Sequence, residues 1–144
     1  MGRVLIEVQQ GDVLSYRSDV LALKFAQDLY GADLAVYKRL SKSSRGPISL
    51  PDLGEVALVD TNGLMTSSQV LFLGVPPIHQ FDYPQIREFG GKVLAYLAGQ
   101  ASQVRHLALT IHGPGYGLDE IEAFESELAG IVEAVSSGRY PARP

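Results

Sequence analysis

Residues 108–120 read Ala-Leu-Thr-Ile-His-Gly-Pro-Gly-Tyr-Gly-Leu-Asp-Glu, an apolar strand-like run followed by a glycine-rich loop and the first residues of a helix. Leu107, Leu109 and Ile111 would line one face of the strand, which we expect from His106 to His112. Glycines between the end of a strand and the start of a helix leave backbone N–H groups uncovered, and such a loop can hold phosphate oxygens. The segment therefore predicts a strand–loop–helix unit of an α/β protein.

The same segment has a second interpretation, as a structural turn. Asp119, Glu120 and Glu122 make the start of the following helix acidic, and carboxylates there stabilise a helix but repel phosphate. Asp119 and Glu122 also have the spacing of a capping box. A phosphate-binding loop and a loop that only joins two elements therefore both remain open.

A second candidate segment, Gln10-Gly11-Asp12-Val13, follows an alternating run at Val4–Val8 that predicts a half-buried first strand. Gly11 permits a turn at this point. Asp12 would either accept a hydrogen bond from an amino group of a ligand or close an Asx-turn with its own backbone. Lys24, at the end of an apolar run, would either face a ligand or extend its ammonium group to solvent.

Strand-like and helix-like patterns alternate along the rest of the chain. Further strands are expected at Val20–Leu23, Glu55–Asp60 and Gln69–Val75, and helices at Asp28–Ser41, from Asp82 to Leu97 and from Asp119 to Val135. The order β-β-α-β-β-α-β-α predicts a three-layer α/β/α sandwich with a mixed sheet. This domain would span residues 1–137, and residues 138–144 would be a tail or the start of a linker to another domain.

Two of the helices carry specific packing expectations. Gly90-Gly91 lies inside the helix that starts at Asp82, which we attribute to the close approach of another backbone, with a ligand contact as the alternative. The apolar stripe of that helix is Ile86, Phe89, Val93 and Leu97, and the buried stripe of the last helix is expected to be Ile121, Phe124, Leu128, Ile131 and Val135.

Composition excludes several classes of protein. The 144 residues are 46% hydrophobic and 19% charged, as expected for one globular domain. Twelve basic and sixteen acidic residues give a net charge of −4 without a basic block, so no nucleic-acid partner is expected. The chain has no cysteine, no apolar run of the roughly 20 residues that a membrane span needs, and no visible signal peptide. A cytoplasmic location is therefore expected.

The sequence assigns no catalytic residue, metal ligand or cofactor. His79, His106 and His112 lack the spacing of helical metal ligands, and no serine lies in a G-x-S-x-G elbow. Neither a Walker loop nor a G-x-G-x-x-G motif follows the first strand. Since no nucleophile can be paired with a base, enzymatic activity has no support in the sequence.

Two segments together resemble the macro domain, a fold that binds ADP-ribose and related nucleotides. Gly11-Asp12-Val13 followed by Asp19–Leu23 is similar to that family's Gly-Asp-Ile turn and second strand. Gly113–Gly117 followed by Leu118–Ala123 is similar to its Gly-Ile-Tyr-Gly loop and helix. The amino-terminal domain of leucine aminopeptidases shares this fold, and the passage from Gln69 to Lys92 resembles it; in those enzymes the chemistry resides in a separate domain.

The chain departs from the hydrolytic macro domains in two ways. Those domains carry an Asn-Ala-Ala-Asn-like segment where this chain has Leu23-Lys24-Phe25-Ala26-Gln27, and they carry a glycine-rich loop where Gly31 stands alone. The resemblance therefore implies a non-catalytic module that binds a nucleotide or ADP-ribose-like molecule, within a larger bacterial-type multidomain protein. The alternative is a degenerate domain that serves protein interaction, assembly or regulation of a linked domain.

The resemblance also implies roles for particular residues. Asp12 would accept from the adenine amino group, the backbone N–H groups of the loop would hold phosphate, and Tyr116 would pack on a ribose. The candidate ligand-binding residues are Gly11, Asp12, Val13, His112, Gly113, Pro114, Gly115, Tyr116, Gly117 and Leu118.

Overall fold

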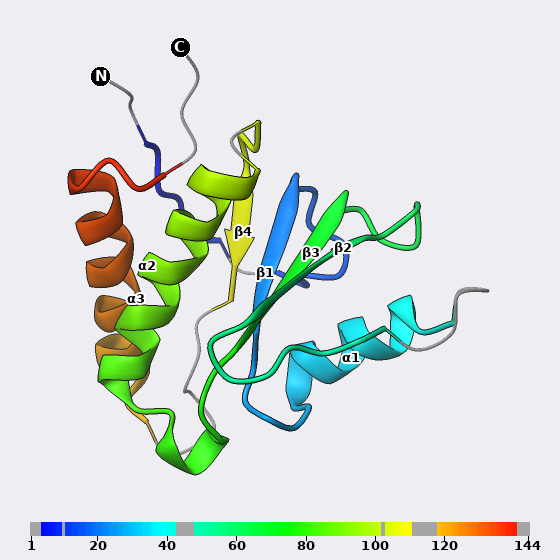
Figure 1. Cartoon of the computed structure of the whole chain (residues 1–144), viewed down its shortest axis with the longest axis horizontal. Coiled ribbons are helices and arrows are strands. Elements are labelled where there is room, and N and C mark those ends of the chain that lie inside the picture. The colour runs from blue at the N-terminus through cyan, green and yellow to red at the C-terminus, as the bar shows by residue number, and fades with distance from the viewer. Residues whose placement is uncertain (1–3, 10, 43–47, 102, 111–117, 141–144) are drawn as a thin grey trace. The chain divides into compact units, whose positions relative to one another are not determined.

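A computed structural model describes residues 4–9, 11–42, 48–101, 103–110 and 118–140. Within these ranges the chain forms β1 (Val20–Phe25), α1 (Gly31–Leu40), β2 (Val56–Asp60), β3 (Gln69–Gly74), the short 3-10 helix η1 (Ile78–Gln80), α2 (Tyr83–Gln100), β4 (Leu107–Leu109) and α3 (Glu120–Ser136) (Figure 1). The protein is thus of the α/β class, as the sequence predicts.

The strands form one mixed sheet in the order β2-β3-β1-β4. β1 pairs in parallel with β3 on one side and with β4 on the other, so that Val20 lies beside both Gln69 and Leu107. β2 is antiparallel to β3. The apolar run at the start of β1 is completely buried, which is typical of a central strand with neighbours on both sides.

α1 packs on one face of this sheet (Figure 1). Alternate residues of β1, Leu21 and Leu23, meet Val36 and Leu40 of α1. The remaining buried members of this core are Met65, Val70 and Phe72. We refer to the described parts of residues 12–81 and 106–110, which form one compact unit, as the sheet unit.

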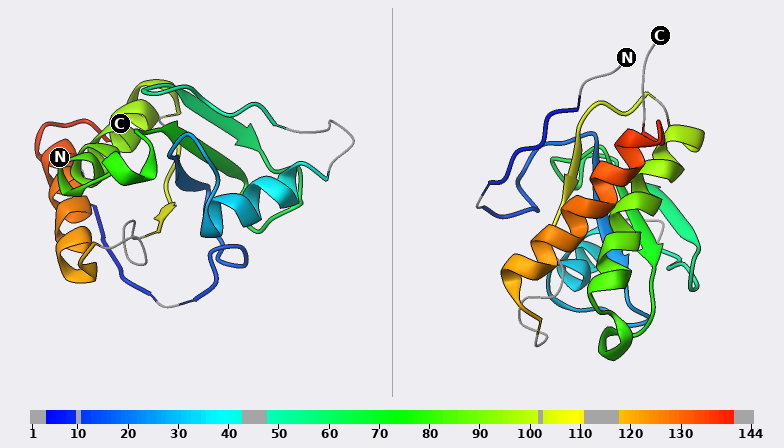
Figure 2. Two further views of the ribbon diagram at one scale, coloured as in Figure 1. Left: turned by 90° about the horizontal axis from the view of Figure 1, so that it is seen from below. Right: turned by 90° about the vertical axis from the view of Figure 1, so that its left-hand side faces the viewer.

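The described parts of residues 1–11, 82–105 and 111–144 form another compact unit, the helical unit, in which α2 and α3 run side by side in the same direction (Figure 2). Glycines allow their close approach. A Cβ atom on Gly130 would collide with the backbone carbonyl of Arg87, and one on Gly90 would lie 2.9 Å from the carbonyl oxygen of Glu127. The expectation that Gly90 admits another backbone is confirmed.

α2 begins as its sequence predicts. The Asp82 carboxylate accepts hydrogen bonds from the N–H of Tyr83 at 2.7 Å and from the N–H of Gln85, and the Gln85 side chain accepts one from the N–H of Asp82 at 3.0 Å, which completes a capping box. The predicted stripe Ile86, Phe89, Val93 and Leu97 is buried throughout.

The predicted first strand is absent. Residues 4–9 have no regular secondary structure, and Val4, Leu5, Ile6 and Val8 are 43, 81, 45 and 66% exposed. A strand needs a neighbour to bind its N–H and C=O groups, and the described residues of the helical unit contain none. The alternating pattern at Val4–Val8 therefore does not form a strand, because no neighbouring strand is described there.

The predicted buried stripe of α3 is confirmed only in part, since Phe124, Leu128, Ile131 and Val135 are half-buried. Ile121 is 68% exposed, and the residues that α3 buries are Ala123, Glu127, Gly130 and Ala134. The physical reason is the glycine contact with α2, because a face of small residues lets the two backbones approach further than a face of large ones. Hydrophobicity alone predicted the larger side chains.

Candidate ligand-binding site

The strand order reverses beside β1. The chain leaves β1 towards β3 and β2, and it later crosses to the opposite side of β1 to form β4. β1 and β4 are parallel, so their carboxyl ends lie at the same edge of the sheet. In open α/β sheets a ligand binds outside the carboxyl ends of the strands at such a reversal. We call this edge between β1 and β4 the switch-point edge.

The backbone that leaves β1 at the switch-point edge is held in an uncommon conformation. Gln27 has a positive φ of 61°, which side chains other than glycine rarely adopt. Its side-chain amide donates to the carbonyl of Val75 at 3.2 Å and so links the ends of β1 and β3. Gly31, also with a positive φ of 48°, then starts α1 without a side-chain cap from Tyr30. The sequence contained only one visible sign of this turn, the isolated Gly31.

Lys24 and Asp33 form a buried ion pair at the same edge. The Lys24 ammonium lies 2.6 Å from Oδ2 of Asp33, and both side chains are only 4% exposed. Burial raises the pKa of Asp33, and the neighbouring Lys24 charge acts in the opposite direction. Lys24 therefore neither extends to solvent nor stands ready for a ligand, the two interpretations that its sequence position allowed. Sequence reasoning missed Asp33 altogether.

Asp12 adopts the Asx-turn that its sequence allowed. Its Oδ1 accepts a hydrogen bond from the N–H of Leu14 at 3.0 Å, and its carbonyl accepts one from the N–H of Ser15 at 3.1 Å. The residue is exposed. A contact between Asp12 and an adenine amino group stays a prediction.

The turn at Asp12 leads to the amino ends of the strands. The carbonyls of Leu14 and Tyr16 accept hydrogen bonds from Oγ1 of Thr66, which lies just before β3. The ring of Tyr16 meets that of His106, just before β4, edge to face at 5.6 Å. The switch-point edge lies instead at the carboxyl ends of β1 and β4, at Phe25 and Leu109.

The other predicted site residues are distributed as follows. Val13 is half-buried and packs against the core under α1, Gly11 is exposed, and Leu118 is half-buried just before α3. His112, Gly113, Pro114, Gly115, Tyr116 and Gly117 lie outside the described residues. The meeting of these residues in one site accordingly stays a prediction.

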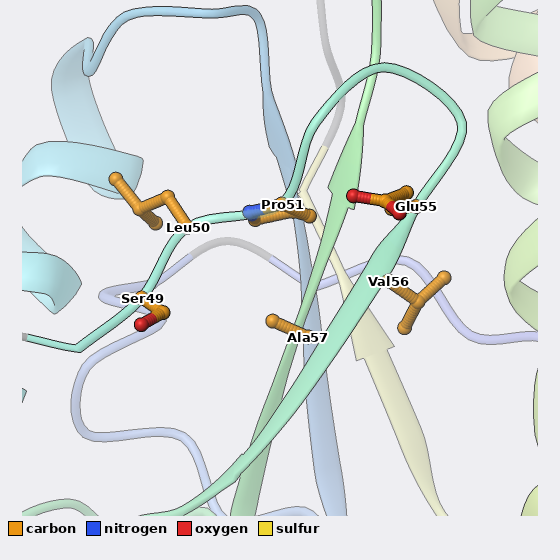
Figure 3. A pocket seen from close by; sticks show the side chains of 6 residues that line it. All are labelled: Ser49, Leu50, Pro51, Glu55, Val56 and Ala57. Atoms are coloured by element: carbon orange, nitrogen blue, oxygen red, sulfur yellow. The ribbon is translucent and has the colours of Figure 1, made fainter.

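A separate open hollow of about 470 Å³ lies beside β2 (Figure 3). The side chains of Ser49–Pro51 line one side and those of Glu55–Ala57 the other. Glu55, the one carboxylate among the described lining residues, already accepts a hydrogen bond from the N–H of Asp52 at 3.3 Å. Gly74 lies against the same turn, where a Cβ would collide with the Asp52 carbonyl. We therefore interpret this hollow as a result of how the turn at Asp52 packs against β3, and not as a ligand site.

Comparisons with known proteins leave the family undefined. No protein-family model matches the chain, and no curated protein matches it significantly. Among the residues that the structure describes, no group of three or more histidines or carboxylates could hold a metal ion. None of the helices in the described ranges combines the length and the apolar character that crossing a membrane requires.

Proposed function

We propose that the chain is a non-catalytic module that binds a nucleotide or ADP-ribose-like ligand at the switch-point edge, on a macro-like three-layer domain. The observation that carries this proposal is the reversal of strand order between β1 and β4. The glycine-rich segment 113–117 follows β4 closely in the sequence. Backbone N–H groups from such a segment suit phosphate oxygens.

Calorimetric titration of the whole chain with ADP-ribose tests the proposal. We expect micromolar binding, and we expect Gly115→Glu to abolish it because a carboxylate would replace the phosphate. Gly99→Glu is the matched control, since a side chain at Gly99 in α2 meets open space. If the unchanged chain gives no heat with millimolar ADP-ribose, or if Gly115→Glu binds like Gly99→Glu, the proposal is wrong.

Asp12→Ala examines the adenine contact separately. If Asp12 accepts from the adenine amino group, the variant should weaken ADP-ribose and leave the affinity for ribose 5-phosphate unchanged. If its carboxylate serves only the Asx-turn with Leu14, both ligands should bind as they do to the unchanged chain.

A second candidate function is protein interaction or assembly, and one observation favours it. The apolar side chains of residues 4–8 are exposed together, and exposed apolar segments mark interaction surfaces more often than isolated apolar residues do. Sedimentation at several concentrations tests this candidate with Leu5→Ser as the variant. A mass that rises with concentration and falls to the monomer value in Leu5→Ser would support assembly through this segment.

A further inference from the structure

Large apolar side chains of α3 form a stripe that the structure covers only in part. Its members follow one another at intervals of three or four residues, so they lie on one face of the helix. Ile121 and Val132 are 68 and 48% exposed. The other members are half-buried, and they are Phe124, Leu128 and Val135. We call these five residues the outer stripe.

The outer stripe lies beside the face through which α3 meets α2. That face consists of the buried residues Ala123, Glu127, Gly130 and Ala134. With 3.6 residues per turn, the centres of the two faces are roughly 130° apart around the helix axis. Ile131 lies between them, and its Cγ1 would be 3.2 Å from a Cβ atom on Gly90. The contact with α2 therefore leaves the outer stripe to one side.

The charged side chains of α3 are all acidic. The helix contains five glutamates and neither lysine nor arginine. Glu120 and Glu125 are exposed, and the helical repeat puts them on the two borders of the outer stripe. Within the described ranges, neither carboxylate takes part in an ion pair. The outer stripe is thus an apolar surface between negative charges.

We propose that the outer stripe is a docking surface for a basic amphipathic helix of a partner protein. Apolar residues at intervals of three and four form the seam between two packed helices. Lysine or arginine side chains beside the partner's seam would face Glu120 and Glu125. From Ile121 to Val135 the stripe runs about 21 Å along the helix axis, enough for about four turns of a partner helix.

The charges argue against a second copy of this chain as the occupant. Two copies of α3 packed through their outer stripes would bring Glu120 and Glu125 of one copy towards the same residues of the other. Like charges brought together across an interface suppress association, and no lysine or arginine of α3 could compensate them. A partner of opposite charge meets no such penalty.

A synthetic peptide of about 18 residues tests the proposal. It carries leucine at the seam positions and lysine beside them, and a second peptide has glutamate in place of every lysine. Fluorescence anisotropy of each labelled peptide is measured with the whole chain, without nucleotide, at physiological ionic strength. We expect a micromolar dissociation constant for the lysine peptide and binding at least about tenfold weaker for the glutamate peptide. No binding of the lysine peptide, or equal binding of both, would overturn the proposal.

Two variants with matched controls locate the binding surface. Ile121→Ser should weaken binding of the lysine peptide at least about tenfold, because a buried apolar contact is lost. Leu53→Ser, at a position of the sheet unit that is 62% exposed, should leave it unchanged. Val132→Ser replaces Ile121→Ser if circular dichroism shows that the latter is unfolded. Equal binding by the stripe variant and Leu53→Ser would refute the outer stripe as the docking surface.

The role of the bordering charges is examined separately. Glu125→Lys should weaken binding of the lysine peptide about threefold or more, because it replaces an attraction by a repulsion. Asp60→Lys changes the net charge of the chain by the same amount at an exposed position of β2, and its effect should be much smaller. Equal effects of the two changes would show that the peptide responds to net charge alone, which contradicts the proposal.

Sedimentation of the chain without peptide examines the second copy. A mass that stays at the monomer value at all concentrations supports an outer stripe open to a different partner. A mass that rises with concentration and returns to the monomer value in Ile121→Ser would overturn the proposal, since a second copy would then occupy the stripe. The peptide measurements contain no nucleotide, so their failure and the failure of ADP-ribose binding are observed independently.

Discussion

Gly130 sets the distance between α2 and α3, because its missing side chain leaves room for the carbonyl of Arg87. Gly130→Ala should therefore lower the free energy of unfolding by about 1–3 kcal/mol, the usual cost of overpacking. Gly99→Ala, where the added Cβ meets open space, should leave stability unchanged or raise it by up to about 1 kcal/mol through helix propensity. Urea denaturation measures both, and equal effects would show that the helices do not rely on this contact.

Glu127 is a carboxyl group that α3 buries, with 5% of the residue exposed. Burial raises the pKa of Glu127 to about 8 from its ordinary value of 4.5. Between these pH values the folded chain keeps a proton that the unfolded chain releases. The contribution of Glu127 to the free energy of unfolding is therefore fully present below about pH 4.5, and it is lost as the pH rises towards about 8.

The pH dependence of urea denaturation examines this residue. The contribution of Glu127 should reduce the free energy of unfolding by up to about 1.4 kcal/mol per pH unit over that window. Glu127→Gln should flatten the profile, and Glu125→Gln, an exposed change on the same helix, should not. A profile of Glu127→Gln that parallels the unchanged chain would refute the assignment.

The Lys24–Asp33 pair shows why the candidate site could be predicted only in part. A lysine after an apolar strand and an aspartate in the first turn of the next helix are both visible in the sequence. Their meeting depends on where α1 begins, which local periodicity does not encode. The Asx-turn at Asp12 could be predicted as one of two interpretations, because it involves only residues close in sequence.

Elements with local signals were the ones that the sequence predicted correctly. The cap at Asp82, the strands β2 and β3 and the buried stripe of α2 each follow from a short stretch of chain. The strand at Val4–Val8 was predicted wrongly and the stripe of α3 correctly only in part, because the burial of both segments depends on a distant partner. The alternation at Val4–Val8 is a strand pattern without a neighbouring strand, and α3 buries the face that fits the glycines of α2.

The loss of the first strand leads to a prediction about that segment. Ile6→Thr should change the free energy of unfolding by less than about 0.5 kcal/mol, because Ile6 is 45% exposed. The comparable change Val70→Thr in β3 should cost about 1–3 kcal/mol, since it places a hydroxyl group at a fully buried position. Thermal denaturation of the two variants distinguishes them, and a cost at Ile6 as large as that at Val70 would show that residues 4–8 are a buried strand after all.

The charge of the whole molecule argues against nucleic acids as ligands. With sixteen acidic and twelve basic residues, the chain repels the phosphate backbone overall. We expect no shift of a short DNA or RNA duplex in gel electrophoresis at physiological ionic strength. Binding that weakens steeply as salt is added would reveal a basic surface that the net charge of −4 conceals.

The central position of β1 has a consequence for how the chain is made. Among the strands of the described residues β1 is synthesised first, and its neighbours β3 and β4 are synthesised later, so Val20 can pair only after Gln69 and Leu107 have been made. Until then the apolar run at Val20–Leu23 has no sheet to enter, and unpaired apolar strands are prone to aggregate. A nascent chain that stalls before Gln69 would therefore be a natural client for chaperones, whereas one that stalls after β4 could already close its sheet.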